Sequence, residues 1–216
     1  MSPIPTDIHF WKSAKKMTNY EATHHVHFLF DPICPWAYQA SLWIREVTNV
    51  RPVKIEWGLL SLEFINRDKK DDRYLAPLRR YRRTFRLLER ARQVGGNLAL
   101  DILYLTIGEA RHERKRSLTD RKMLENSLEA AGLPLSMIEE TRVDPDLDEQ
   151  LERAYTDSVS RGAFGVPTIY LDDSQLPFYG PLIEVVPMGE EAGQLWDHIS
   201  ELISLPYFFE LKRTRT

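Results

Sequence analysis

The sequence predicts an α/β protein in which a block of helices interrupts a single sheet. Residues 24–31 and 53–62 have the composition of strands joined by a helix, and residues 168–171 and 176–179 have that of two further strands. Apolar residues at helical spacing fill the interval between these regions. The predicted order is therefore strand–helix–strand, a helical block, then strand–strand–helix.

The first strand and the helix after it meet at a turn that contains two prolines. Val26, Phe28 and Phe30 alternate along the strand, which we expect to become buried on both faces toward its end. Pro32 and Pro35 then interrupt strand pairing, and Pro35 is well placed to open a helix. That helix is expected to end before residues 51–52, and its apolar side chains recur at helical spacing: Ala40, Trp43, Ile44 and Val47.

The middle of the chain is expected to be helical. One apolar stripe advances in steps of four and three, and the glycines at 95–96 are expected to end its helix. The stripe consists of Tyr74, Leu78, Tyr81, Phe85 and Leu88. Further helices are expected at 98–110, 118–131, 134–141 and about 144–161, with the charged turn RHERKRS after the first of them.

Strand spacing returns after the loop at 162–167, and a final amphipathic helix is expected at 189–203. This order of elements is that of a thioredoxin-like fold with an inserted all-helical subdomain. We therefore expect three parts in the chain. They are an N-terminal arm at 1–22, a thioredoxin-like domain made of 23–66 and 162–216, and an inserted helical subdomain at 67–161.

Composition narrows the classes of protein to consider. The chain has 216 residues, 43% of them hydrophobic, and a net charge of −3, which gives no overall attraction to nucleic acid or anionic lipid. No apolar run approaches the roughly 20 residues of a membrane span, and the N-terminus does not have the pattern of a secretory signal. One cysteine cannot form an internal disulfide, so we expect a cytoplasmic, reducing setting.

That one cysteine, Cys34, is the predicted catalytic residue. It lies at the end of a strand and the start of a helix, where backbone N–H groups and the helix dipole favour an anion. The position predicts a thiolate with a pKa below the ordinary value of about 8.5. Pro35 stiffens the turn, and Trp36 supplies an apolar surface beside the sulfur.

A second element, Gly165-Val166-Pro167-Thr168, precedes a strand. A proline at the first residue of a strand can follow a cis peptide bond, and we expect one between Val166 and Pro167. The Val166 backbone would then lie beside Cys34 and align a thiol-bearing substrate. The predicted substrate-binding residues are Pro35, Trp36, Val166, Pro167 and Thr168.

The segments FDPICPWAY and GVPT, together with the helical insertion, resemble the DsbA-like branch of the thioredoxin superfamily. The C-terminal stretch GPLIEVVPMGEEAGQLWDHIS…YFFELKRTRT is similar to the mycothiol-dependent nitroreductase and thiol-disulfide oxidoreductase group. The resemblance covers 24–216. It implies a cytoplasmic thiol-disulfide oxidoreductase with Cys34 as nucleophile, mycothiol or a similar low-molecular-weight thiol as cosubstrate, and a disulfide or electrophilic small molecule as substrate.

The chain departs from the motif of that group, which is Cys-Pro-Trp-Cys. Ala37 occupies the position of the second cysteine, which in a dithiol site resolves the mixed disulfide made by the first. Two origins fit this difference. The protein is either a natural enzyme with one thiol, which a second small thiol resolves, or it carries a deliberate cysteine-to-alanine replacement.

Two other functions stay open on the sequence. Hydroxychromene-carboxylate isomerases and kappa-class glutathione transferases resemble the chain in their helical insertion. They have serine at the position of Cys34 and use a bound thiol cofactor as nucleophile. The third alternative is a non-catalytic descendant that binds a partner through the former cleft. The prediction also leaves a homodimer open.

Two clusters suggest sites that we consider weaker. His24, His25 and His27 could suggest a metal, but strand alternation places His24 on the opposite face, so no metal is expected. The run at 79–83 contains four arginines around Tyr81 and could suggest nucleic acid. Because Tyr81 belongs to the apolar stripe, a solvated helix is favoured. The alternative is that some of these arginines face the cleft and attract an anionic thiol cofactor or an acidic substrate.

Overall fold

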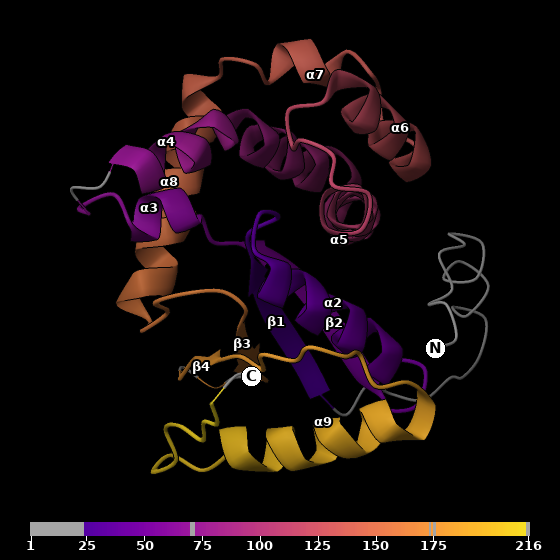
Figure 1. The fold of residues 1–216 in the computed structure, drawn as a ribbon, viewed down its shortest axis with the longest axis vertical. Coiled ribbons are helices and arrows are strands. Elements are labelled where there is room, and N and C mark those ends of the chain that lie inside the picture. The colour runs from indigo at the N-terminus through magenta and orange to yellow at the C-terminus, as the bar shows by residue number, and fades with distance from the viewer. Residues whose placement is uncertain (1–23, 70–71, 173, 175, 215–216) are drawn as a thin grey trace.

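The computed structural model describes residues 24–69, 72–172, 174 and 176–214 (Figure 1). The arm expected at 1–22 lies outside these residues. The predicted order of elements is confirmed, with helices inserted between the second and third strands. A separate helical subdomain with boundaries at 67 and 161 stays a prediction.

One mixed sheet has the strand order β2-β1-β3-β4. The strands are β1 (His24–Phe30), β2 (Val53–Leu59), β3 (Thr168–Leu171) and β4 (Phe178–Tyr179). The central strand β1 runs parallel to β2 and antiparallel to β3, and β3 runs antiparallel to β4. Because β1 pairs on both sides, it joins the N-terminal and C-terminal parts of the chain.

Two helices from distant parts of the chain, α2 (Pro35–Val47) and α9 (Gly189–Ile203), pack together beside the sheet (Figure 1). The indole Nε1 of Trp43 donates a hydrogen bond of 3.2 Å to the carbonyl oxygen of Ala192. The ring centroids of Trp43 and Trp196 lie 6.2 Å apart, and both side chains are fully buried. These contacts fix α2 against α9.

Six helices lie among the residues described between β2 and β3, and they form an arc beyond one end of the sheet (Figure 1). They are α3 (Leu62–Ile65), α4 (Asp72–Arg80), α5 (Arg82–His112), α6 (Arg121–Ala131), α7 (Met137–Glu140) and α8 (Pro145–Ser160). Among the described residues, no helix combines the length and apolar character needed to cross a membrane.

The long element α5 contains the break that the glycines at 95–96 predict. Gly96 has φ +66° and ψ −161°, which is not a helical conformation, so two helices meet across a kink at this residue. A positive φ is tolerated by glycine, which has no Cβ. The second of the two helices extends to His112.

Other boundaries differ from the prediction. The second strand ends at Leu59 instead of residue 62, because Ser61 caps the short helix α3. The Ser61 Oγ accepts a hydrogen bond of 3.2 Å from Glu63 N. We did not predict this helix. The predicted apolar stripe crosses a break at Tyr81, between α4 and α5. Helix α6 begins after Asp120, whose carboxylate accepts a hydrogen bond of 3.2 Å from Met123 N.

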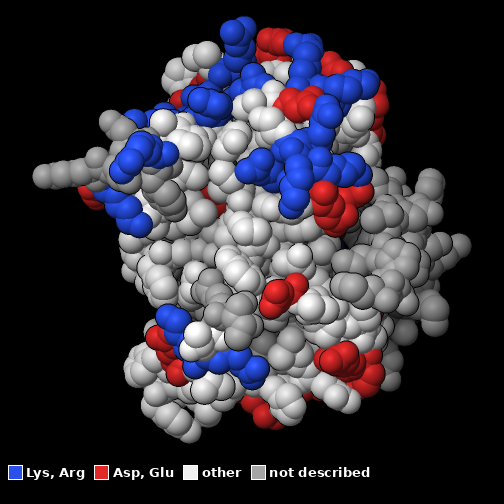
Figure 2. Space-filling model, in the orientation of Figure 1, with Lys and Arg blue, Asp and Glu red and all other residues white. Residues whose placement is uncertain are grey.

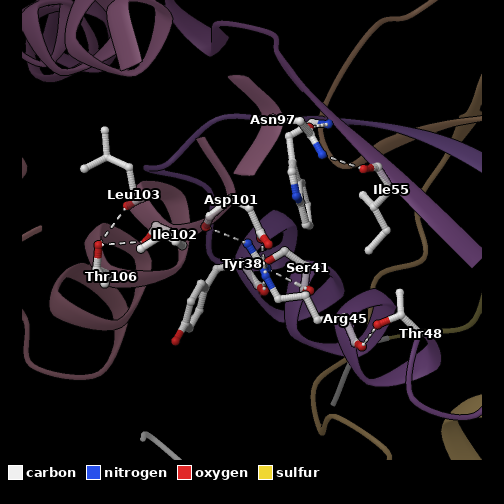
Figure 3. Close-up of polar contacts among 11 residues, drawn as sticks. Tyr38, Ser41, Arg45, Thr48, Ile55, Asn97, Asp101, Ile102, Leu103 and Thr106 are labelled. Atoms are coloured by element: carbon white, nitrogen blue, oxygen red, sulfur yellow. Dashed lines mark hydrogen bonds and ion pairs between the residues drawn. The ribbon is translucent and has the colours of Figure 1, made fainter. Parts of the chain in front are cut away.

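A buried ion pair joins α2 to α5 (Figure 3). Arg45 Nε donates to Asp101 Oδ1 at 2.8 Å, and Arg45 Nη1 donates to the carbonyl oxygen of Ser41 at 2.9 Å. The Arg45 guanidinium also lies 4.1 Å from the centroid of the Trp57 ring. Only 6% of the Arg45 side chain is exposed, so its charge depends on these partners.

We expect Arg45→Ala to lower the free energy of unfolding by roughly 3–5 kcal/mol, because Asp101 loses its partner and the space above Trp57 empties. Urea unfolding followed by circular dichroism measures the change. The matched control is Arg153→Ala, whose pair with Glu149 is 66% exposed on both sides and should cost less than about 1 kcal/mol. Equal losses in the two variants would contradict this account of the ion pair.

Candidate functional site

Cys34 occupies the N-cap position of α2, directly after the turn that follows β1. Its backbone N–H donates a hydrogen bond of 3.0 Å to the carbonyl oxygen of Asp31, which closes the turn. Pro35 is the first residue of the helix and has no N–H to lose there. The Cys34 sulfur accepts a hydrogen bond of 3.4 Å from Ala37 N, so the sulfur caps the helix.

The loop before β3 lies against the sulfur. The peptide bond between Val166 and Pro167 is cis, and the Cys34 thiol donates a hydrogen bond of 3.6 Å to the Val166 carbonyl oxygen. Thr168 is buried, and its hydroxyl donates 2.7 Å to the carbonyl oxygen of Gly165, which holds the loop in shape. The structure thus brings together two segments that are 132 residues apart.

The remaining predicted site residues differ in their exposure to solvent. Trp36 is half-buried and packs against the core, whereas Pro35 is exposed. Ala37 is fully buried, so its methyl group has no access to solvent. Only 7% of Cys34 is exposed. The sulfur-bearing residue is therefore almost fully buried.

Burial raises the pKa of the Cys34 thiol, although the backbone N–H groups of Ala37 and Trp36 act in the opposite direction. The negative charge of Asp31 raises this pKa further. The predicted lowering of the pKa is therefore wrong for this structure. Loss of water around the sulfur outweighs the stabilisation of a thiolate by the start of the helix.

Asp31 is the residue of the site that sequence reasoning missed. Its carboxylate is almost fully buried, and its two oxygens accept backbone hydrogen bonds of 2.9 Å from Ile33 and 2.8 Å from Leu62. The carboxylate therefore ties the turn after β1 to the start of α3. Burial raises the pKa of Asp31 to about 7. An acidic residue directly after a strand buried on both faces was the available signal.

The three histidines of β1 do not converge. His24 Nδ1 lies 2.8 Å from Asp172 Oδ2, whereas the His27 ring stacks on Tyr170 at 5.8 Å. Within the part of the chain that the structure describes, no group of three or more His, Cys, Asp or Glu side chains could hold a metal ion.

The arginines of the inserted helices are largely engaged by acidic neighbours. Figure 2 shows Lys and Arg side chains gathered at the end of the molecule formed by these helices, interspersed with Asp and Glu. Arg82 pairs with Glu63, and Arg83 donates to the carbonyl oxygen of Thr119. Arg86 and Asp148 form two hydrogen bonds of 2.7 Å. These pairs favour a structural role for the three arginines.

Residues 33–213 match the family model described as "Rv2466c-like: Mycothiol-dependent nitroreductase Rv2466c". The protein Rv2286c of Mycobacterium tuberculosis (strain ATCC 25618 / H37Rv), described as uncharacterized, is 31% identical over 198 residues, which cover 88% of this chain and 82% of Rv2286c.

Three solved structures share the fold at 16% sequence identity each. A 2-hydroxychromene-2-carboxylate isomerase has a TM-score of 0.59, covering 82% of this chain and 93% of the isomerase. The cytosolic disulfide reductase DsbM from Pseudomonas aeruginosa, solved with GSH, has a TM-score of 0.53, with 82% and 100% covered. The probable DsbA oxidoreductase SCO1869 from Streptomyces coelicolor has a TM-score of 0.56, with 88% and 94% covered.

At such low identity these likenesses show the fold alone, and they confirm the predicted α/β, DsbA-like thioredoxin fold. The family match goes further, because it extends over most of the chain and supports a thiol-dependent redox role. From the match over residues 33–213 and the 31% identity to Rv2286c, we conclude that this chain belongs to the Rv2466c-like family.

Proposed function

We propose that the protein is a thiol-disulfide oxidoreductase in which Cys34 is the nucleophile and mycothiol is the small-thiol cosubstrate. The observation that carries this proposal is the contact of 3.6 Å between the Cys34 sulfur and the Val166 carbonyl oxygen, at the start of a helix. The description of the family as mycothiol-dependent supports the choice of cosubstrate. The single cysteine favours a reducing, cytoplasmic setting.

The proposed reaction consists of two thiol–disulfide exchanges. In the first, the Cys34 thiolate attacks a disulfide RS–SR′, a Cys34–SR bond forms, the RS–SR′ bond breaks, and the displaced R′S⁻ takes up a proton. In the second, the thiolate of mycothiol attacks the SR sulfur and displaces the Cys34 thiolate. One cycle therefore converts RS–SR′ and mycothiol into R′SH and a mixed disulfide of mycothiol.

Ala37 makes the second exchange depend on an external thiol. The Ala37 methyl group is fully buried one helical turn from Cys34, and its N–H is already bonded to the sulfur. A methyl group cannot attack the mixed disulfide. The first substrate and the resolving thiol would therefore bind in succession on the same side of the turn. The residues on that side are Pro35, Trp36, Val166, Pro167 and Thr168.

A second candidate is an isomerase or transferase in which a bound thiol is the nucleophile. The low exposure of Cys34 and the raised pKa of its thiol favour it, because both lower the fraction of reactive thiolate. Cys34→Ser separates the two functions. Turnover that survives this substitution supports the isomerase or transferase, and turnover that disappears supports the oxidoreductase.

Incubation with oxidised mycothiol should add one mycothiol to the wild-type protein, and intact-mass analysis measures the adduct. Ala37→Cys should release the adduct through a disulfide between positions 34 and 37, because a second thiol then lies one turn away. Ala40→Cys is the matched control, since Ala40 is also fully buried on α2. No adduct on the wild type would contradict the proposed function.

Asp31→Asn should lower the pH midpoint of Cys34 alkylation by iodoacetamide, by on the order of one pH unit. The sign follows from the order of titration. The Asp31 carboxyl ionises at a pKa of about 7, below the raised pKa of the thiol, so its negative charge is present when the thiolate forms.

The control for this charge change is Asp146→Asn, because Asp146 is exposed in the first turn of α8. Its midpoint should equal that of the wild type. Equal midpoints in all three proteins would show that Asp31 has no influence on the thiol.

A further inference from the structure

The last turn of α5 contacts the turn that precedes Cys34. His112 Nε2 lies 2.9 Å from the carbonyl oxygen of Pro32. A carbonyl oxygen only accepts hydrogen bonds, so Nε2 carries the hydrogen. Burial lowers the pKa of His112 to about 4, which keeps the imidazole neutral at pH 7. The inserted helices therefore hold the backbone two residues before the sulfur.

The same end of α5 contacts the first turn of α2 through Tyr38. The Tyr38 and His112 rings stack at 4.9 Å with an interplanar angle of 21°. The Tyr38 hydroxyl donates a hydrogen bond of 2.5 Å to Glu113. Tyr38 N also donates to the Cys34 carbonyl oxygen at 3.1 Å, so the ring belongs to the turn that carries the sulfur.

Gly108 makes this close approach possible. A Cβ at Gly108 would lie 2.5 Å from Tyr38 Cδ2, a distance that carbon atoms do not adopt without displacement. Gly108 and His112 are four residues apart and share one face of α5. The Tyr38 ring, which is 2% exposed, therefore lies against the α5 backbone at one glycine and against the imidazole one turn later.

These contacts bracket the sulfur. Pro32 precedes Cys34 by two residues and Tyr38 follows it by four, and both are held by His112. The hydrogen bonds of the sulfur itself run to Ala37 and to Val166, and Val166 belongs to the opposite loop. The position of the sulfur relative to the Val166 carbonyl oxygen thus depends on where α5 holds the turn.

We propose that His112 and Tyr38 are positioning residues that set the alignment of Cys34 with the Val166 loop from the end of the inserted helix α5. Neither touches the reacting sulfur atoms in this proposal. It rests on the proposed role of Cys34 as nucleophile. It assigns the helical insertion a part in thiol exchange, in addition to covering one end of the sheet.

Two reactions of the same sulfur test the proposal. Exchange with oxidised mycothiol requires alignment of three sulfur atoms against the Val166 loop, whereas iodoacetamide at a pH above the thiol pKa requires only a thiolate. His112→Ala should slow the exchange roughly tenfold, and alkylation much less, because misplacement by a fraction of an ångström affects only the aligned reaction. A change in packing alone would leave the ratio of the two rates unchanged.

Conservative variants and a control accompany that measurement. His112→Gln keeps a side-chain N–H and should restore most of the exchange rate. Tyr38→Phe keeps the ring stack and removes only the hydrogen bond to Glu113, so it should slow exchange less than His112→Ala does. His198→Ala, at an exposed position of α9, should change neither rate. Circular dichroism confirms that each variant is folded.

The positioning role would be overturned if folded His112→Ala and Tyr38→Phe had the same ratio of exchange rate to alkylation rate as the wild type. If the wild type itself forms no adduct, the proposed function fails. The pH midpoint of Cys34 alkylation then tests whether His112 positions the turn. The titratable groups beside the sulfur are Asp31 in its own turn and Tyr104 on α5. Both residues are still present in His112→Ala. A lower midpoint in this variant would therefore show that the turn, without its contact to His112, admits water to the sulfur. An unchanged midpoint would reject the positioning role.

Discussion

The pairing of β1 with strands on both sides is the constraint on which the site depends. β1 runs parallel to β2 and antiparallel to β3, so the end of β1 and the start of β3 meet at the same edge of the sheet. Cys34 follows the first of these points and Val166 precedes the second. Strand order therefore brings these two segments together, although the long helical insertion separates them in the sequence.

Two opposing effects act on the sulfur. The N-cap position supplies hydrogen bonds from backbone N–H groups and favours a thiolate, whereas burial and the charge of Asp31 favour a thiol. In this structure burial is the larger effect. A buried thiol with a raised pKa is largely protonated at neutral pH, so little reactive thiolate is present.

Because the chain has no second cysteine, the contacts that hold the Cys34 turn matter more for the proposed reaction. A dithiol site can resolve its mixed disulfide internally, whereas in the proposed reaction a site with Ala37 would hold the mixed disulfide until an external thiol arrives. The Asp31 carboxylate holds the turn through hydrogen bonds from Ile33 N and Leu62 N. His112, at the end of α5, holds it through a hydrogen bond to the Pro32 carbonyl oxygen. The adduct would therefore rest on a turn that is tied to both the sheet and the inserted helices.

The sequence by itself determined the order of the elements and the identity of the two segments that meet. Alternating apolar residues in β1, the prolines on both sides of Cys34 and the proline before β3 are local signals, and local backbone preferences decide such features. The helical character of the insertion was also predictable from apolar spacing. The break at Gly96 was predictable too, because a glycine pair favours the end of a helix, but the angle at which the second helix leaves the kink depends on what packs on either side.

Only the tertiary structure decided the chemical environment of the sulfur. The burial that raises the thiol pKa, the inward position of the Asp31 carboxylate and the approach of His112 to Pro32 all involve residues distant in sequence or the packing of whole elements. Hydrogen bonding to a helix start is a local property and can be deduced from neighbouring residues. Desolvation is set by every atom that excludes water from a site, so it follows from the assembled fold.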